Sequence, residues 1–377
     1  GFAISAWAYQ HFVQSNQLRE KIDKLLKDLT IRNYRDLELV SEDIRDAVIR
    51  KPVPEDLAGA IYQAFDTLSA ATGKTGFALR SSAIGEDTSF SFAGQYLSFL
   101  NVRRDDLLDH YRQILASKFT PSAIYYLLSH SISDLDLGMG VACLEMVEAA
   151  VSGVVYTLDP VNPGGAALVV NAIFGLGSYL VDGTLTPDVY HLSRAEGKIV
   201  YQSISSKPIQ LKLSAEGGVV QAPVSPEMQG QSSLTPANLA LLREYALKVE
   251  KHFGCPQDIE WAMDQAAKLF LVQTRPLNLT QSRATVIIPA QYDSRLIMEG
   301  GIAICSGVGS GPVFHLVSIE DLDRVPKGAV LVAASPSPYL VMVMDRIQAL
   351  VTRVGGSTSH LATLARELGV PTVVGLS

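Results

Sequence analysis

The pattern of apolar and polar positions divides the chain into a helical beginning, a middle rich in strands, and an end where strands and helices alternate. Residues 6–71 follow the helical period, with a helix-start signal at Ser41 and breaks at Pro52 and Pro54. From Phe77 onward the sequence becomes rich in loop and strand patterns. The chain is therefore expected to combine helices with sheets.

Four segments of the middle region have readable patterns. Apolar stretches at residues 138–159 and 166–171 predict buried strands. Residues 235–253 predict an amphipathic helix, and the polar residues 207–235 predict an excursion on the surface. This region is therefore expected to contain buried strands and one amphipathic helix.

A hairpin is predicted at residues 257–276, where two strand-like runs flank a polar turn centred near Ala266. This register places Glu260 opposite Val272 or Gln273. Gln273 and Arg275 share a face because side chains alternate along a strand. One carboxylate, one amide oxygen and one guanidinium then converge, which is enough to hold Mg²⁺ and a polyphosphate. A half-exposed hairpin with an ordinary ion pair is the simpler alternative.

The end of the chain predicts a separate small domain. Residues 278–288 are polar and lack a period, so they predict a linker. Residues 301–376 alternate between strand and helix patterns. The expected fold of this last part is a small α/β domain.

A helix near the end of the chain carries the most informative histidine. An apolar run at residues 347–351 stops at a glycine pair, and a helical period follows until Gly369 and Pro371. The apolar residues of this period share one face: Leu361, Leu364, Ala365 and Leu368. His360 is therefore expected in the first turn, beside unpaired backbone N–H groups that favour phosphate. It either caps the helix or carries a phosphoryl group on a ring nitrogen.

Composition narrows the classes of function. The 377 residues suffice for two or three domains, and the net charge of −7 argues against a nucleic-acid partner. No apolar run approaches a membrane span, and the N-terminal residues lack the pattern of a signal peptide. The three cysteines are far apart without metal-binding spacing, which suits the cytoplasm.

The residues around His360 closely resemble the phosphohistidine motif of the PEP-utilising enzyme family. Residues 354–371 read VGGSTSHLATLARELGVP. The family core is Gly-Gly-x-Thr-Ser/Cys-His followed by Ala-Arg-Glu-Leu-Gly-x-Pro, and Leu361 departs from it where a small residue is usual. The resemblance implies that His360 is the phosphoryl carrier and that the Thr358 hydroxyl orients its imidazole.

Residues 77–95, FALRSSAIGEDTSFSFAGQ, resemble the nucleotide-binding domain of the same family. The resemblance implies that this segment wraps the phosphates of ATP, with Arg80 and Gly94 in contact. An arginine fork and exposed N–H groups suit phosphate oxygens, although the loop alone would pass for a solvated turn. Glu145 stands where the family has a glutamine near the adenine. Its carboxylate can still accept a hydrogen bond from the base, but it lacks the NH₂ donor of glutamine.

The predicted hairpin resembles the end of that nucleotide-binding domain, through the strings DIEW and QTRP. The resemblance implies that Glu260 and Gln273 bind Mg²⁺ and that Arg275 contacts phosphate. The implied fold is α/β: an α+β, ATP-grasp-type domain at residues 1–277 that lacks its first segment, then a linker at 278–300. A mobile, swivelling phosphohistidine domain follows at residues 301–377.

The implied function is that of an ATP-dependent dikinase. With Mg²⁺, ATP would phosphorylate His360, and the phosphoryl group would pass to pyruvate to give PEP, AMP and phosphate. The barrel that binds PEP and pyruvate is expected outside this chain. No nucleic-acid or membrane partner is expected, and a homodimer is one option for the oligomeric state.

Two other functions remain open from the sequence. A different acceptor would make the protein a small-molecule or drug phosphotransferase. Alternatively, the chain is a non-catalytic ATP-sensing or phosphocarrier module. The departures at Glu145 and at Ser178, which stands where the family commonly has glutamate, favour this alternative. The retained Glu260 and His360 count against such a module.

Overall fold

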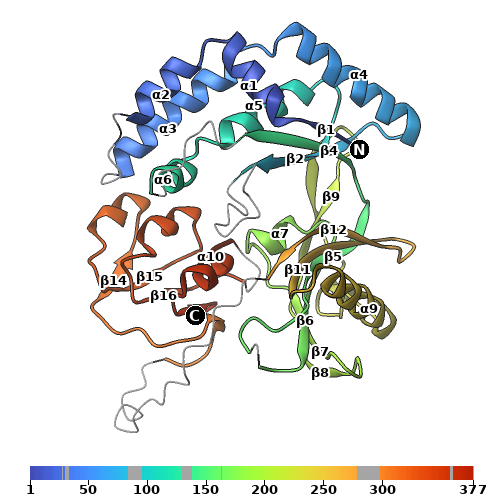
Figure 1. The fold of residues 1–377 in the computed structure, drawn as a ribbon. Coiled ribbons are helices and arrows are strands. Elements are labelled where there is room, and N and C mark those ends of the chain that lie inside the picture. The colour runs from blue at the N-terminus through green and yellow to red at the C-terminus, as the bar shows by residue number, and fades with distance from the viewer. Residues whose placement is uncertain are drawn as a thin grey trace. The chain divides into compact units, whose positions relative to one another are not determined.

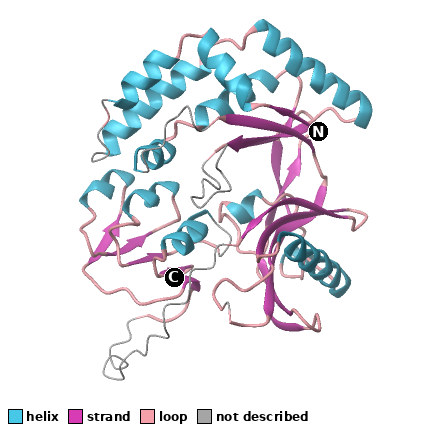
Figure 2. Ribbon diagram, in the orientation of Figure 1, coloured by secondary structure: helices cyan, strands magenta, loops and turns pink. Residues whose placement is uncertain are grey.

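The computed structural model describes residues 1–27, 29, 34–83, 96–129, 138–162, 164–277, 298–356 and 360–376. The described chain mixes helices and strands throughout (Figure 2), which confirms the expected α/β class. It divides into two compact units. Unit 1 comprises Gly1–Met146 with Leu213–Val220, and unit 2 comprises Val147–Lys212 with Gln221–Ser377. Unit 1 is built around an antiparallel sheet, and unit 2 contains an antiparallel sheet and a mostly parallel one.

Unit 1 combines a four-stranded sheet with a group of helices that lies along it (Figure 1). The sheet has the order β1-β4-β2-β3, and its strands are β1 (Phe2–Ile4), β2 (Phe77–Ala83), β3 (Ser98–Val102) and β4 (Met139–Glu145). The helices are α1 (Ala6–Ser15), α2 (Arg19–Lys27), α3 (Tyr34–Ile49), α4 (Glu55–Thr72), α5 (Leu107–Ser117) and α6 (Pro121–Ser129).

Two expectations for unit 1 were wrong. Ser41 lies inside α3, where its hydroxyl donates to the Phe119 carbonyl at 2.6 Å instead of starting a helix. The region after Phe77 was expected to hold loops and strands, but it contains α5 and α6. Both helices bury most of their residues, including Tyr111 and Ile124.

Unit 2 is built on a six-stranded antiparallel sheet with the order β12-β11-β5-β6-β7-β8. Its strands are β5 (Ala149–Tyr156), β6 (Ala167–Phe174), β7 (Asp188–Ser193), β8 (Ile199–Ser203), β11 (Gln257–Asp264) and β12 (Leu269–Pro276). The short helix α7 (Ser178–Val181) follows β6. Strands β9 (Ile209–Leu213) and β10 (Val219–Pro223) form a two-stranded sheet, and α8 (Pro226–Gln229) follows.

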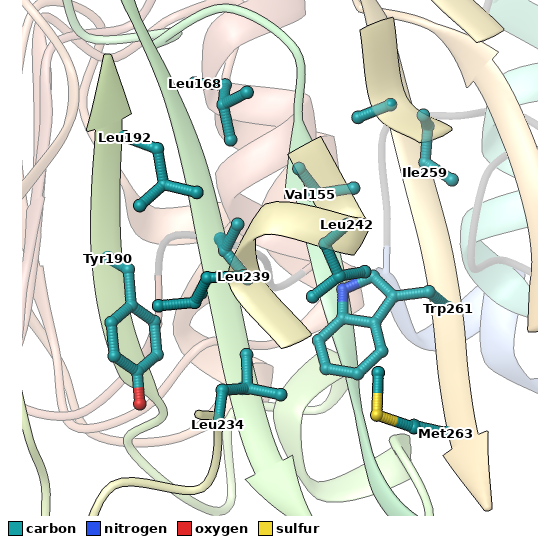
Figure 3. Close-up of a cluster of buried hydrophobic side chains, with 13 residues drawn as sticks. Val155, Leu168, Tyr190, Leu192, Leu234, Leu239, Leu242, Ile259, Trp261 and Met263 are labelled. Atoms are coloured by element: carbon teal, nitrogen blue, oxygen red, sulfur yellow. The ribbon is translucent and has the colours of Figure 1, made fainter. Parts of the chain in front are cut away.

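Helix α9 (Pro236–Phe253) lies against one face of the six-stranded sheet (Figure 1). Thr235 and Asn238 form a capping box at its start, and Gly254, at φ +72°, ends it in the left-handed conformation. The amphipathic helix expected at residues 235–253 is confirmed. Leu239 and Leu242 of this helix belong to the same buried cluster as Trp261 of the sheet, and Leu242 lies beside the Trp261 ring (Figure 3).

Unit 2 also contains a five-stranded sheet with the order β13-β17-β16-β15-β14. Its elements are β13 (Ile302–Cys305), β14 (Val313–Leu316), η2 (Ile319–Arg324), β15 (Val330–Ala333), η3 (Pro338–Val343), β16 (Ala349–Thr352), α10 (His360–Leu368) and β17 (Thr372–Val374). Strands β14 to β17 run parallel, and β13 is antiparallel to β17. The expected alternation of strands and helices at residues 301–376 is confirmed, whereas residues 278–288 lie outside the described residues.

The segment at residues 207–235 was expected on the surface, yet it supplies a fully buried ion pair. Lys207 and Asp188 both have zero side-chain exposure, and Lys207 Nζ lies 2.5 Å from Asp188 Oδ1. Lys207 Nζ also donates to the Ser205 carbonyl at 2.7 Å. The second oxygen of Asp188 accepts from the backbone N–H and hydroxyl of Ser233, at 2.8 and 2.7 Å. The pair and its hydrogen bonds therefore connect the three segments of unit 2 that contain Asp188, Lys207 and Ser233.

Replacing Lys207 by methionine should destabilise unit 2, because it leaves the Asp188 charge buried without its cation. We expect the Lys207→Met variant to lose about 3–5 kcal/mol in the free energy of unfolding. Urea unfolding would be followed by Trp261 fluorescence in a Trp7→Phe background, since the chain has only two tryptophans. Lys198→Met removes an exposed lysine paired with Glu196 and should leave the unfolding midpoint unchanged. Equal midpoints for both variants would contradict a stabilising role for the buried pair.

Candidate functional site

The hairpin of β11 and β12 carries three of the residues expected to bind Mg²⁺ and phosphate. Glu260 is paired in register with Gln273, and Asp258 is paired with Arg275. A β-bulge follows Glu260, and Ala267 turns the chain with a φ of +59°. The predicted hairpin is confirmed, including Gln273 as the partner of Glu260.

Alternation along β11 decides which side chains face the site. Ile259, Trp261 and Met263 are buried in the core beneath α9 (Figure 3). Because successive side chains point to opposite faces, Asp258 and Glu260 lie on the other face of the sheet. Burial of the apolar set thus presents the two carboxylates together, on the side away from α9.

Asp258 and Arg275 form a tight ion pair on that second face. Arg275 donates from Nε and Nη2 to Asp258 Oδ2, at 2.9 and 2.7 Å. The Asp258 side chain is only 8% exposed, and that of Arg275 is 25% exposed. Burial acts to lower the pKa of Arg275, but the charge and hydrogen bond of Asp258 outweigh it and hold the pKa above its ordinary value. Arg275 is therefore a permanent cation.

The pair Glu260 and Gln273 fits a magnesium ion that draws its other ligands from elsewhere. Both side chains are half-buried, lie on adjacent strands and supply oxygen atoms, the ligand type that Mg²⁺ prefers. Among the described residues no three His, Cys, Asp or Glu side chains gather into a metal cluster. A magnesium ion here would be completed by phosphate and water, which is its usual mode of binding.

Residues that the sequence analysis missed extend the same face across the sheet. Tyr156 of β5 is paired with Asp258, and it is fully buried. Val154 is paired with Glu260 on one side and with Asn171 of β6 on the other, so the buried Asn171 amide belongs to the Glu260 row. Their neighbours lie far away in sequence, so no local pattern marks them.

Arg80 and Glu145 lie in unit 1, on the neighbouring strands β2 and β4. Arg80 was expected in a loop but lies within β2, where it is paired with Ala142. Glu145 is three residues beyond Ala142, so by the two-residue period it lies on the opposite face of the sheet from Arg80. The structure thus separates these two expected ATP contacts within their own sheet.

Glu145 forms an ion pair with Lys74. Lys74 Nζ lies 2.7 Å from Glu145 Oε1 and donates to the Met146 carbonyl at 2.8 Å. The sequence around Lys74 superficially resembles a phosphate-binding loop, but Gly73 simply ends α4 in the left-handed conformation, at φ +69°. The acceptor that Glu145 retains is therefore already used by a lysine.

The helix expected to hold His360 in its first turn is present, since α10 spans His360–Leu368. Gly369 follows in the left-handed conformation at φ +64°, which confirms the expected stop signal. Leu361, Leu364 and Ala365 are buried as expected. Leu368, expected on the same face, is 51% exposed, because it is the last residue of the helix. Thr358 and Gly94 lie outside the described residues.

Two family models match the chain. Residues 1–296 match the pyruvate phosphate dikinase AMP/ATP-binding domain, and residues 325–377 match the mobile domain of PEP-utilising enzymes. The first match covers more than half of the chain. These matches span both the Glu260–Arg275 hairpin and the His360 helix.

Curated relatives match along the whole chain. The probable phosphoenolpyruvate synthase of Methanothermobacter thermautotrophicus is 33% identical over 379 residues, covering 100% of this chain and 54% of the relative. The phosphoenolpyruvate synthase of Deinococcus radiodurans is 35% identical over 387 residues, covering 100% of this chain and 49% of the relative. The chain thus spans about half the length of the curated relatives it matches.

The Asp258–Arg275 pair should be required for the stability of this face. Asp258→Asn removes the charge that compensates Arg275, so we expect a loss of about 3 kcal/mol in the free energy of unfolding of unit 2. Trp261 fluorescence in urea measures this loss. Glu196→Gln, which removes an exposed carboxylate paired with Lys198, is the matched control and should not shift the midpoint. An Asp258→Asn midpoint equal to that of the control would show that Arg275 is compensated by other groups.

Proposed function

The chain belongs to the pyruvate phosphate dikinase AMP/ATP-binding domain family, and from this premise we propose that it performs the ATP-dependent half of a dikinase reaction. An ATP-grasp-type domain at residues 1–277 would bind ATP, and residues 278–300 would link it to a mobile domain at 301–377. The face shared by Glu260, Gln273 and Arg275 is the observation that carries this proposal.

Each proposed nucleotide contact has its own role. Arg275, a permanent cation, would neutralise phosphate charge, and Glu260 and Gln273 would hold Mg²⁺. Bound Mg²⁺ would supply charge neutralisation on the phosphate oxygens. Arg80 and Gly94 would contact phosphates and Glu145 would lie near the adenine, as the family resemblance implies. Positioning and electrostatics, rather than covalent chemistry by these groups, would lower the barrier.

His360 is proposed as the group that carries phosphorus between substrates. A neutral ring nitrogen would attack ATP in line, forming an N–P bond while the P–O bond to AMP breaks. Water or phosphate would then remove the terminal phosphoryl group, and pyruvate would accept the remaining one to give PEP. The Thr358 hydroxyl would orient the imidazole, as the resemblance implies. The pyruvate site is proposed to lie outside this chain, in the further length of protein that the relatives possess.

A non-catalytic ATP-binding module is the second candidate, and the Lys74–Glu145 pair favours it. This pair occupies the position where the family has an uncharged glutamine, so base recognition would differ from the family pattern. Such a module would bind nucleotide without forming phosphohistidine. Labelling of the protein therefore separates the two candidates.

His360→Ala should abolish covalent labelling of the protein by ATP, because it removes the proposed nucleophile. The protein would be incubated with β-³²P-labelled ATP and Mg²⁺, and acid-labile, base-stable label would be counted. His315→Ala, which replaces an exposed histidine of β14, is the matched control and should keep full labelling. Label that persists in His360→Ala would assign the carrier to another residue. ATP binding without label on the unaltered protein would favour the non-catalytic module.

Glu260→Gln should raise the Mg²⁺ concentration needed for labelling, because an amide replaces the only carboxylate of the proposed metal pair. We expect the half-maximal Mg²⁺ concentration to rise about tenfold or more, as losses of groups at metal sites typically do. Glu244→Gln, on the exposed side of α9, should leave it unchanged. An unchanged Mg²⁺ dependence in Glu260→Gln would remove Glu260 from the metal site.

A further inference from the structure

Arg366 of α10 is a buried arginine whose guanidinium faces a buried tyrosine of the six-stranded sheet. Arg366 is 4% exposed and Tyr156 is 1% exposed. The guanidinium carbon lies 5.4 Å from the centre of the Tyr156 ring, and Nη2 lies 3.4 Å from the phenol oxygen. Arginine is rarely buried without compensation, because removing its charge from water is costly. The buried guanidinium of Arg366 is therefore expected to have a specific role.

Thr363 connects α10 to Arg275, which is proposed to contact phosphate. Its hydroxyl oxygen lies 3.5 Å from Nη2 of Arg366 and 3.5 Å from Nη2 of Arg275. Arg275 in turn donates to Asp258, the strand neighbour of Tyr156. The helix that begins with His360 thus touches the sheet through a chain of polar groups, beginning one turn after the histidine.

At two further places within unit 2, the five-stranded part comes close to loops that follow strands β5 and β6. Gly183 lies close to Gly355, one of the two glycines that precede α10, since a Cβ atom added to Gly183 would stand 3.7 Å from Gly355 Cα. The Ser306 hydroxyl lies 3.4 Å from the Val161 carbonyl oxygen. These places, like the contact of α10, bring together segments that lie far apart in sequence.

We propose that Arg366 and Thr363 are positioning residues that dock the histidine helix on the sheet face carrying Glu260, Gln273 and Arg275. This inference rests on the proposed function, because it assigns the dock to the transfer from ATP to His360. Docking would fix the distance and direction from which the histidine approaches the nucleotide. A misplacement of about 1 Å can slow such a step a hundredfold.

The chemistry of the contact suits a dock that forms and releases. A guanidinium can lie over an aromatic ring and still donate in its own plane, which defines an orientation that an apolar side chain would not. When the helix leaves, the guanidinium regains its hydration. Burial raises the pKa of Tyr156 to about 12, although the Arg366 charge acts to lower it. The phenol is therefore neutral at physiological pH and stays available as a hydrogen-bonding group.

The test is a single-turnover measurement of label transfer from β-³²P-labelled ATP to His360, at saturating ATP and Mg²⁺. We expect Arg366→Met to slow the transfer about tenfold or more, while the affinity for ATP changes little. Arg366→Lys keeps the charge without the planar fork, and Tyr156→Phe keeps the ring without the hydroxyl, so both should slow transfer less. Arg324→Met replaces an arginine whose side chain is 76% exposed and should match the unaltered protein.

A second measurement follows the dock itself, independently of phosphoryl transfer. The protein would be labelled with 3-fluorotyrosine, and the ¹⁹F signal of Tyr156 would be assigned by Tyr156→Phe among the 14 tyrosines. In the docked state this signal should be shielded from a paramagnetic solute, and Arg366→Met should remove part of the shielding. Should Arg366→Met fail to fold, Arg366→Lys supplies the same comparison.

The two measurements distinguish a failure of the proposed docking contact from a failure of the proposed function. If Arg366→Met transfers label to His360 at an unchanged rate, the proposal is overturned. It is also overturned if Arg366→Met slows the transfer while the Tyr156 signal stays fully shielded. Absence of label on the unaltered protein would instead refute the proposed function. In that case a loss of Tyr156 shielding in Arg366→Met would still establish the contact, and unchanged shielding would refute it too.

Discussion

Burial of one apolar row on β11 is the constraint on which the candidate site depends. Ile259, Trp261 and Met263 pack beneath α9, and this packing fixes which face of the strand is internal. A slip of one residue would reverse every side chain of the strand, taking Trp261 out of the core. The fit is close: a Cβ atom on Gly153 of the neighbouring strand would stand 2.7 Å from the Trp261 ring. The position of Glu260 on the opposite face is thus a consequence of hydrophobic packing.

The buried polar pair of unit 2 supports the same packing from the other end of the sheet. Asp188 binds Lys207 and also the backbone and hydroxyl of Ser233, two residues before the capping residue of α9. A buried ion pair adds little net stability compared with apolar packing, but it accepts only one arrangement of donors. Its contribution here is to fix where the segment before α9 lies. The helix then covers Trp261 in a single register.

Sequence reasoning located the parts of the site that depend on local rules. The position of the turn narrowed the partner of Glu260 to Val272 or Gln273, and the structure pairs it with Gln273. The helix with His360 in its first turn followed from the helical period and the stop signal. It missed Tyr156, and it expected Lys207 on the surface. The reason is physical, because the environments of Tyr156 and Lys207 are built by segments far away in sequence. The polar sequence around Lys207 does not indicate that its side chain pairs with a buried aspartate.

Hydrogen-bond geometry distinguishes a permanent ion pair from the proposed reversible dock. Arg275 binds Asp258 at 2.7 and 2.9 Å, within one hairpin, as befits a group that must keep its place. Thr363 contacts Arg275 at 3.5 Å and Arg366 contacts Tyr156 at 3.4 Å, near the outer limit of hydrogen bonding. A carrier that must later reach a second site cannot be held too strongly at the first. On the proposed function, such long contacts orient the helix while leaving it free to depart.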